Sequence, residues 1–465
     1  MKQKCILVCL FLSMLFILFL VFPHNSYAGE YSIRVNNQQN VVTIYKNGNP
    51  IKAMLCSTGR ATPSSGTYNL DNKYRWLSLV GGVYGQYCTR IVGSILFHSV
   101  PYFINGDGGS LEWWEYDKLG TSASAGCIRL QCIDAKWIYD NIPAGTPVTF
   151  YSDSNPGPLG KPDCINVSNM PDHYRCWDPT DPDNNNPWKT FKDVAFNASF
   201  YANKYPDLKA AFGTNEIKLR NHFYNNGIAE GRQGSAAVDI KYYVNVNPDL
   251  KKAFGNDWYK IYNHLIFTGI YEGRKTALGF DVKSYRNNYK DLDKAFGNNL
   301  IKYFEHYNND GVKENRVAMT DTRTFKVLFD ADYYAKENND LKVAFGNNFE
   351  KLYNHFLNCG IYEGRIAQVT FSVTEYLKQN DDLEKAFGKK NYHDAFMHFL
   401  AYGINEERKT SPLFNVSVYK KNYPELASKL KSTKDYFINY IEEGLANNRE
   451  AIKIIEKKDP EEEII

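Results

Sequence analysis

The sequence predicts a multidomain protein in which a mainly β, β-sandwich-like domain precedes an α-helical repeat domain. Three observations lead to this prediction. The chain has 465 residues, more than one ordinary core accommodates. Residues 31–151 contain short apolar runs separated by turn signals, as strands do. Beyond residue 194, one motif of about 42 residues recurs six times.

The N-terminal segment has the pattern of an export signal. Lys2 and Lys4 precede an uncharged apolar run over residues 5–22, and Ser26 and Ala28 occupy the −3 and −1 positions of a cleavage site. We expect residues 1–28 to be a signal peptide; the run is also just long enough for a retained membrane anchor. Either way the rest of the chain is expected to be secreted and extracytoplasmic.

The elements of the β domain follow in order. A polar turn separates the first two strands, and Asn47-Gly48 predicts a hairpin. Pro143-Ala144-Gly145 ends the first clear helix. The predicted strands are 31–35, 41–45, 51–55, 91–97 and 147–151, and the predicted helix is 133–142.

A proline-rich segment follows this domain. Residues 152–193 hold seven of the 18 prolines, which indicates a linker or an irregular strap. Trp177 and Trp188 favour a strap that packs against the domain.

Residues 194–450 contain the six copies of the motif. Phrases such as YPDLKAAFG and HFYNNGIAEGR recur, and the leucines of the DL pair are spaced by 42, 42, 49, 42 and 43 residues, the long spacing reflecting an insertion near 317–327. Each copy predicts short helices, with Asp239, Asp281 and Asp330 as N-caps. Such helices bury their faces only by stacking with other copies. The charged residues 451–465 form a tail.

The number of cysteines after the expected signal is odd, so they cannot all form disulfides within the chain. Seven of the nine cysteines follow the signal, so an exported chain retains at least one free thiol. Cys164 and Cys176 lie in one loop-rich stretch and form the first candidate disulfide. Cys132 is expected to be a core thiol.

Cys127, in the run Ser124-Ala125-Gly126-Cys127, is the candidate nucleophile. A thiol has an ordinary pKa of ~8.5 and needs a base to accept its proton. His98, at the end of an apolar run, is the candidate base. Gly126 allows backbone amides to converge on an oxyanion. Residue types alone do not separate this pair from coincidence.

His98 followed by Ser124-Ala125-Gly126-Cys127-Ile128-Arg129 resembles the active-site signature of the L,D-transpeptidase (YkuD) family. The phrase TPSSGTYNL at 62–70 is also similar to a family segment. The resemblance covers residues 31–151 and implies a cell-wall enzyme without a cofactor. The helical copies resemble those of secreted bacterial wall proteins.

Site residues follow from this resemblance position by position. Cys127 would be the acylated nucleophile and His98 its base, oriented by the backbone carbonyl of Ser99. Ser124 would support the loop, and the amides of Gly126 and Cys127 would form the oxyanion hole. Arg129 would bind a substrate carboxylate or form a structural ion pair. Many members have His at the position of Ala125, and the spacer between His98 and Ser124 is long.

Three functions remain open. The resemblance implies a transpeptidase that crosslinks peptidoglycan stem peptides, or an L,D-carboxypeptidase that trims them on the same scaffold. The third is a non-catalytic wall-binding protein, which an intact His98 and Cys127 disfavour. The repeats are expected to contact a wall polymer or surface protein. The nearly balanced formal charge of +3 implies no large electrostatic partner, so we expect no nucleic acid among the partners. The spacing of His, Cys and Asp predicts no metal site.

Overall fold

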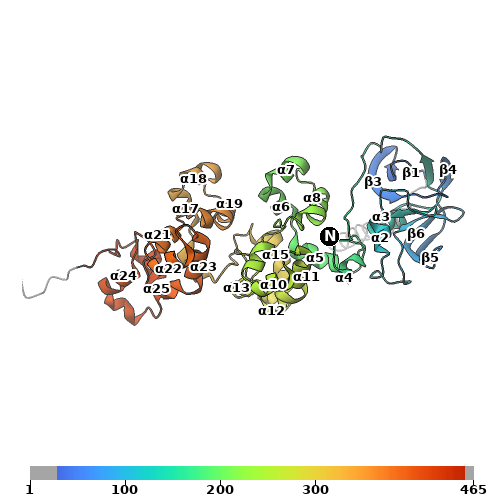
Figure 1. Cartoon of the computed structure of the whole chain (residues 1–465). Helices are drawn as coiled ribbons and strands as arrows, with labels where there is room; N and C mark the ends of the chain where they lie inside the picture. The colour runs from blue at the N-terminus through green and yellow to red at the C-terminus, as the bar shows by residue number, and fades with distance from the viewer. Residues whose placement is uncertain (1–28, 456–465) are drawn as a thin grey trace, which may run out of the picture. The chain divides into compact units, whose positions relative to one another are not determined.

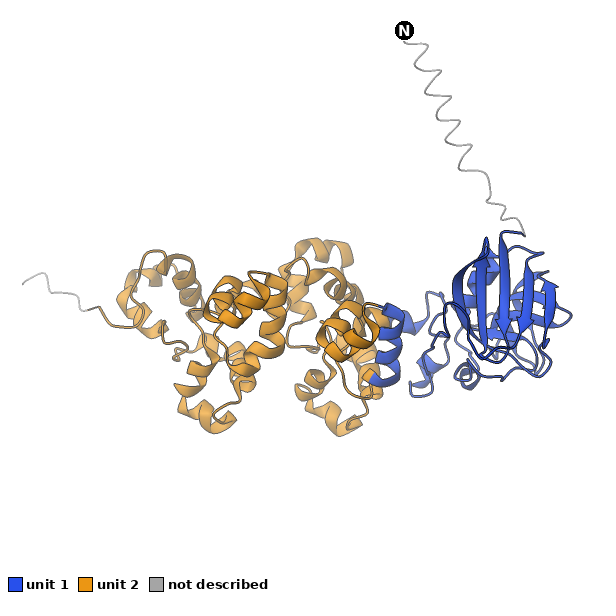
Figure 2. Cartoon of the chain, turned by 90° about the horizontal axis from the view of Figure 1, so that it is seen from above, with its two compact units in different colours: residues 1–191, 215–226 blue, residues 192–214, 227–465 orange. Residues whose placement is uncertain are grey.

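The structure is a computed structural model that describes residues 29–455. The expected signal at 1–28 and most of the charged tail lie outside these residues. The chain divides into two compact units, shown in Figure 2: unit 1 comprises residues 1–191 and 215–226, and unit 2 comprises residues 192–214 and 227–465. Within the described part, no helix combines the length and apolar character needed to cross a bilayer.

Unit 1 is built on one nine-stranded sheet (Figure 1). The strand order is β4-β9-β1-β2-β3-β8-β7-β6-β5, and the pairs β1/β9 and β7/β8 are parallel. The strands are β1 Tyr31–Asn36, β2 Val41–Lys46, β3 Asn49–Ser57, β4 Gly66–Asn69, β5 Lys73–Ser78, β6 Tyr84–Val92, β7 Ile95–Ser99, β8 Ile128–Leu130 and β9 Pro147–Tyr151.

Turn chemistry explains where several of these strands end. Asn47 and Gly48 adopt φ of 50° and 78°, which the tight hairpin between β2 and β3 requires. The run at 91–97, expected to be one strand, is divided between β6 and β7. Gly93, with φ of 54°, makes the turn between them. The short strands β4, β5 and β8 were not predicted.

The core of unit 1 lies on the apolar face of this sheet. Ile33, Val42 and Ile44 from one half of the sheet and Phe97 and Ile128 from the other are fully buried in a single cluster. Helix α3 (Cys132–Asn141) packs on β6 and β7 and contributes Cys132, Ala135 and Ile138 to the cluster. The predicted helix is thus confirmed with bounds one residue earlier.

The proline-rich strap packs on unit 1 through buried polar contacts. Asp178 accepts a hydrogen bond from the backbone amide of Cys132 (2.7 Å), and Asp181 accepts one from the side chain of Gln86 (2.6 Å). Trp188, which is buried, donates to the backbone carbonyl of Tyr174 (2.8 Å). The strap helices are α4 Asp172–Arg175 and α5 Pro187–Ala195, and helix α2 Trp113–Tyr116 precedes them in the long spacer.

Two sequence expectations about this region need correction. Helix α8 (Glu216–His222) and the following turn η1 (Phe223–Gly227) lie beyond the expected domain boundary, yet α8 and most of η1 belong to unit 1, where Asn221 and Asn225 donate to strap carbonyls. Cys164 and Cys176 are both free thiols, as are the other five cysteines of the described chain.

The region that holds the motif copies is largely helical. The helices before the fourth copy are α6 Ala198–Lys204, α7 Pro206–Phe212, α9 Ile240–Asn245, α10 Pro248–Phe254, α11 Trp258–His264, α12 Ile270–Glu272, α13 Val282–Asn288, α14 Lys290–Phe296, α15 Leu300–His306 and α16 Thr322–Leu328. The later ones are α17 Ala331–Glu337, α18 Asn339–Phe345, α19 Phe349–His355, α20 Ile361–Glu363, α21 Val373–Lys378, α22 Asp381–Phe387, α23 Tyr392–Ala401, α24 Val416–Asn422 and α25 Thr433–Asn439.

Short π- and 3₁₀-helical turns complete these copies. The π-helical turns are η2 Leu265–Gly269, η3 Tyr307–Gly311, η4 Phe356–Gly360 and η7 Tyr440–Gly444, and the 3₁₀ turns are η5 Gly403–Asn405 and η6 Pro424–Ser428. The predicted caps are present, since the side chains of Asp239, Asp281 and Asp330 accept backbone amide hydrogen bonds at their helix starts.

The motif histidines have a structural role in the second to fifth copies. The hydroxyl of a buried tyrosine lies at hydrogen-bond distance from Nδ1 of the histidine, as Tyr243 does with His264 (3.0 Å). The same hydroxyl explains the glycine five residues after the histidine, because a Cβ on Gly269 would lie 1.9 Å from it. The sixth copy has Asn439 instead, and Tyr419 donates to its side chain (2.8 Å).

The EGR phrases form ion pairs within a copy. Arg274 pairs with Glu272 of its own phrase (2.6 Å) and with Asp249 of the DL pair (2.8 Å). The insertion forms α16, which packs against α25 through Arg323 and Asp435 (2.5 Å).

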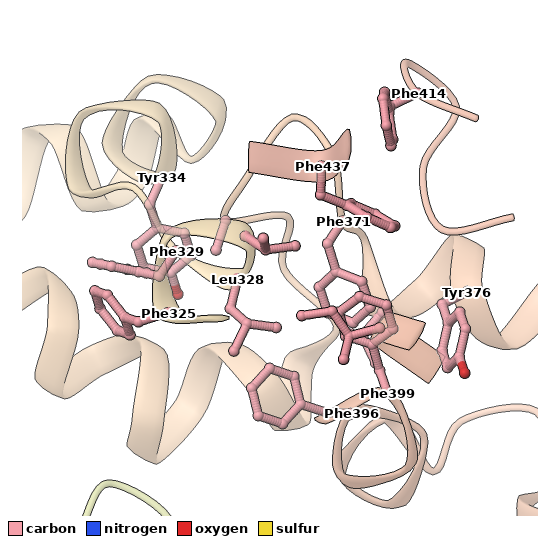
Figure 3. Packing of buried hydrophobic residues seen from close by; sticks show 14 of the residues in the cluster. Phe325, Leu328, Phe329, Tyr334, Phe371, Tyr376, Phe396, Phe399, Phe414 and Phe437 are labelled. Atoms are coloured by element: carbon pink, nitrogen blue, oxygen red, sulfur yellow. The ribbon is translucent and has the colours of Figure 1, made fainter. Parts of the chain in front are cut away.

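An aromatic-rich core of unit 2 joins the last three copies (Figure 3). Phe371 and Phe399 stack with ring centroids 4.1 Å apart, and Phe399 also contacts Phe437. Phe329 and Tyr334 extend the cluster into the fourth copy. The last three copies therefore share a continuous core, as their short helices require.

Candidate active site

The parallel pair β7/β8 brings the two predicted catalytic residues to one face of the sheet. His98 lies opposite Arg129 in the register, and Cys127 immediately precedes β8. Since alternate residues of a strand share a face, Cys127, Arg129 and His98 project to the same side. Phe97 and Ile128 project to the other side, into the core. The site thus uses the face of these strands that the core leaves available.

His98 is held as a neutral imidazole. Its side chain is buried, with the residue 2% exposed, and Nδ1 lies 2.5 Å from the backbone carbonyl oxygen of Ser99. This carbonyl can only accept, so Nδ1 carries the proton and Nε2 presents a lone pair. Burial lowers the pKa of His98 to about 4, although the Ser99 carbonyl opposes the shift. At neutral pH the ring is therefore an uncharged base.

Gly85 on β6 makes room for this imidazole. A Cβ at Gly85 would lie 3.0 Å from Nδ1 of His98 and 3.1 Å from the sulfur of Cys88. The Ser99 hydroxyl fixes the same region, because it accepts from the amide of Gln86 (3.0 Å) and donates to the carbonyl of Val100 (2.9 Å). The position of the His98 ring is therefore set by strand β6 and by the residues that follow His98 in the chain.

The Cys127 thiol rests in its protonated form. Its sulfur donates to the backbone carbonyl of Ser94 (3.4 Å). Burial raises the pKa of the Cys127 thiol, while the backbone amide of Leu96 and the guanidinium group of Arg129 oppose this rise. A raised thiol pKa and a lowered imidazole pKa leave both groups uncharged at neutral pH.

Ser124 closes the loop that carries the nucleophile. Its hydroxyl donates to the carbonyl of Cys127 (2.6 Å) and accepts from the amide of Gly126 (3.1 Å). The Gly126 amide is thus engaged within the loop, which differs from the oxyanion role expected for it. The amide of Cys127 is the remaining candidate donor for the oxyanion.

A second loop, residues 58–62, supports the loop of residues 124–127 that carries the candidate nucleophile. Thr58 and Ala61 hydrogen-bond through their backbones to Ser124 (2.9 Å) and Ala125 (3.0 Å). The hydroxyl of Thr62 donates to the carbonyl of Gly126 (2.7 Å). These contacts fix the segment immediately before the sulfur.

Glycine at position 126 is needed for space. A Cβ there would lie 2.9 Å from the side chains of both Ala61 and Ile95. Its φ lies outside the left-handed region, so the conformational argument made from the sequence is wrong at this position. The absence of a side chain lets the two loops approach each other.

Arg129 has a structural ion pair. Its guanidinium group binds the carboxylate of Glu115 on α2, which also pairs with Lys118. The structure thus favours the structural alternative for Arg129 over a substrate contact. In the same helix Tyr116 is fully buried, so it lines no surface, whereas Trp114 is 40% exposed.

Sequence reasoning missed Gly85, Thr62 and Asn40 among the residues that build this site. Asn40 accepts from both the amide (2.9 Å) and the hydroxyl (2.8 Å) of Thr58, and so anchors the supporting loop. TPSSGTYNL, which begins with Thr62, was the one signal for these residues. Gly85 and Asn40 carry no local signal, because their roles depend on strands far away in the sequence.

The N-terminal part of the chain resembles known proteins. Residues 30–150 match the family model of the L,D-transpeptidase catalytic domain, YkuD. A protein of Bacillus subtilis (strain 168) named "Putative L,D-transpeptidase YciB" is 38% identical over 125 residues. This alignment covers 25% of the present chain and 63% of that relative's length.

Solved structures overlap the same part of the chain. An L,D-transpeptidase from Mycobacterium smegmatis is 20% identical, with a TM-score of 0.23, over 26% of this chain and 59% of its own. An L,D-transpeptidase from Mycobacterium tuberculosis H37Rv is 24% identical, with a TM-score of 0.22, over 26% of this chain and 58% of its own.

Proposed function

Because residues 30–150 form a YkuD L,D-transpeptidase catalytic domain, we propose that the protein crosslinks peptidoglycan stem peptides through an acyl-enzyme at Cys127. The observation that carries this proposal is the neutral imidazole of His98. Its Nδ1 faces the Ser99 carbonyl, and its ring shares a sheet face with Cys127. That arrangement supplies a base to a thiol that is protonated at rest.

Two half-reactions follow from this arrangement. The thiol leaves the Ser94 carbonyl and transfers its proton to Nε2 of His98 as the sulfur attacks the donor peptide carbonyl. The peptide C–N bond breaks, His98 returns the proton to the leaving amine, and the terminal D-residue departs. In the second half-reaction an acceptor amine attacks the thioester and His98 accepts its proton. The C–S bond breaks, and His98 returns the proton to the Cys127 thiolate. The peptide bond energy is retained, so no cofactor takes part.

The decisive experiment supplies purified enzyme with stem tetrapeptides and identifies the products by mass spectrometry. Crosslinked dimers support the transpeptidase, whereas tripeptides without dimers identify an L,D-carboxypeptidase. Cys127→Ala should abolish both products and leave the circular dichroism spectrum unchanged, since removing one small thiol leaves little cavity. His98→Gln should reduce turnover by about 10²–10⁴-fold. Retained turnover in Cys127→Ala would refute the mechanism.

Covalent trapping offers a second check on the nucleophile. A carbapenem should acylate Cys127, and peptide mapping should locate the adduct on that residue. An adduct on Cys88 or Cys132 instead would show that Cys127 is not the nucleophile.

We further propose that the enzyme works outside the cytoplasm, with its helical region holding it on the wall or on a surface protein. Multiple weak contacts along that region would raise avidity without joining the chemistry. A chain ending at Asn226 retains helix α8 of unit 1 and tests this idea. It should act on soluble stems but bind isolated sacculi less than the full chain does. Equal sacculus binding by both chains would contradict the anchoring role.

A further inference from the structure

Three side chains with metal-binding atoms converge in the fourth copy of the motif. His355 ends helix α19, Cys359 lies in the π-helical turn η4, and Glu363 ends helix α20. One ligand atom from each lies within 4.8 Å of the other two. Within residues 29–455 no other group of three or more His, Cys, Asp or Glu side chains meets this criterion.

The thiol is what distinguishes this copy from the others. The second copy has His264, Thr268 and Glu272 at the same positions. In both copies a tyrosine hydroxyl lies at hydrogen-bond distance from the histidine, and an arginine binds the glutamate. The histidine and glutamate are therefore explained by packing in both copies, whereas Cys359 is additional.

His355 is oriented to offer a lone pair to a metal. Its Nδ1 lies 2.9 Å from the hydroxyl of Tyr334, which fixes the ring and leaves Nε2. In the third copy the corresponding nitrogen of His306 lies 3.9 Å from the carboxylate of Glu314, which shows where Nε2 points in this framework.

Two carboxylates and two cationic side chains surround the cluster, so their charges balance before a metal binds. Arg365 holds Oε2 of Glu363 (2.5 Å) and also pairs with Asp340 (2.8 Å), which leaves Oε1 of Glu363 for a ligand. The ammonium group of Lys204 is the other charge that acts on Cys359. A divalent cation would displace the thiol proton of Cys359, and the resulting thiolate would neutralise half of its charge.

We propose that Nε2 of His355, Sγ of Cys359 and Oε1 of Glu363 form a zinc site. Sulfur, imidazole nitrogen and carboxylate oxygen are the ligands that Zn²⁺ takes in proteins, and three protein ligands leave a fourth position open for water or a bound molecule. Ligand atoms in a tetrahedral zinc site lie about 3.5 Å apart, so side-chain rotation suffices to close the cluster. This site is separate from the catalytic thiol and independent of the proposed enzymatic activity.

Cobalt titration of the reduced full-length chain tests the proposal. One equivalent of Co²⁺ should produce a sulfur-to-cobalt charge-transfer band in the near ultraviolet, and Zn²⁺ should remove it. Cys359→Ser should eliminate the band and leave the thermal unfolding curve unchanged. Tyr334→Phe keeps the ring in the core and should weaken Co²⁺ binding by about 10–100-fold through loss of the histidine orientation.

The second copy supplies a gain-of-function control. Thr268 is exposed and occupies the position of Cys359, so Thr268→Cys should raise the stoichiometry from one metal to two. A stoichiometry that stays at one would overturn the proposal that this framework becomes a site when it carries a thiol. A band that survives Cys359→Ser but disappears in Cys127→Ala would place the metal at the catalytic thiol. That result, or no band at all, would also overturn the proposal.

Discussion

Acid should destabilise unit 1 in a way that depends on His98. Burial lowers the pKa of this imidazole to about 4, from the ordinary value of 6.5 that it regains on unfolding. Between these values the unfolded chain binds a proton that the folded chain does not. The free energy of unfolding therefore falls as the pH drops from 6.5 towards 4. Above pH 6.5 the imidazole is neutral in both states, so His98 no longer lowers the free energy of unfolding.

The size of this effect follows from the difference between the two pKa values. One pKa unit corresponds to ~1.4 kcal/mol, so the complete loss is about 3 kcal/mol. That is a large share of the roughly 5–15 kcal/mol by which a domain is ordinarily stable. Little of it should be screened by solvent, because His98 is 2% exposed.

Urea unfolding followed by tryptophan fluorescence measures the loss. Six of the seven tryptophans belong to unit 1 and only Trp258 to unit 2, so the signal reports mainly on unit 1. The matched control is His98→Gln, which cannot titrate, so the acid effects of carboxylates cancel in the comparison. The difference in unfolding free energy between the two chains should change by about 3 kcal/mol between pH 7.5 and 4. An identical pH dependence of both chains would refute the buried, neutral imidazole.

Three further outcomes are expected. Ser124→Ala should lower kcat roughly five- to 150-fold, equivalent to about 1–3 kcal/mol, because the nucleophile loop loses two hydrogen bonds; an unchanged kcat would contradict the closing role. Release of the terminal D-residue should stay pH-independent from 8 down to 5, because His98 is neutral throughout; a limb near pH 6.5 would count against its lowered pKa. Gly269→Ala should destabilise unit 2 by about 1–3 kcal/mol, and Tyr243→Phe should restore part of the loss by removing the hydroxyl in the way; no rescue in thermal melts would contradict this clash.

The sequence predicted the candidate thiol Cys127 and the candidate base His98, which strands β7 and β8 bring to one face of the sheet, because both lie in short local signatures. It also predicted helix α3 and the caps at Asp239, Asp281 and Asp330, since capping depends on neighbouring residues. These elements needed no knowledge of distant contacts.

Other features depend on contacts between distant strands or loops. Gly85 and Asn40 are ordinary residues in sequence, and only the pairing of β6 with β7 and the packing of the 58–62 loop give them roles. The hydrogen bond from the Gly126 amide to the Ser124 hydroxyl likewise depends on the orientation of the Ser124 side chain, which the sequence does not specify. Helix α8 belongs to unit 1 because of its contacts with the strap, and the repeat pattern in the sequence does not reveal these contacts.

The hydrogen bond from the Cys127 thiol to Ser94 has a consequence for how long the enzyme lasts. Peroxides and hypochlorous acid attack thiolates, and an exported protein has no glutathione pool to restore an oxidised sulfur. A cysteine that stays protonated until a substrate arrives reacts slowly with such oxidants. In the extracytoplasmic setting proposed above, a nucleophile that rests as a thiol would lose some reactivity and resist irreversible oxidation for longer.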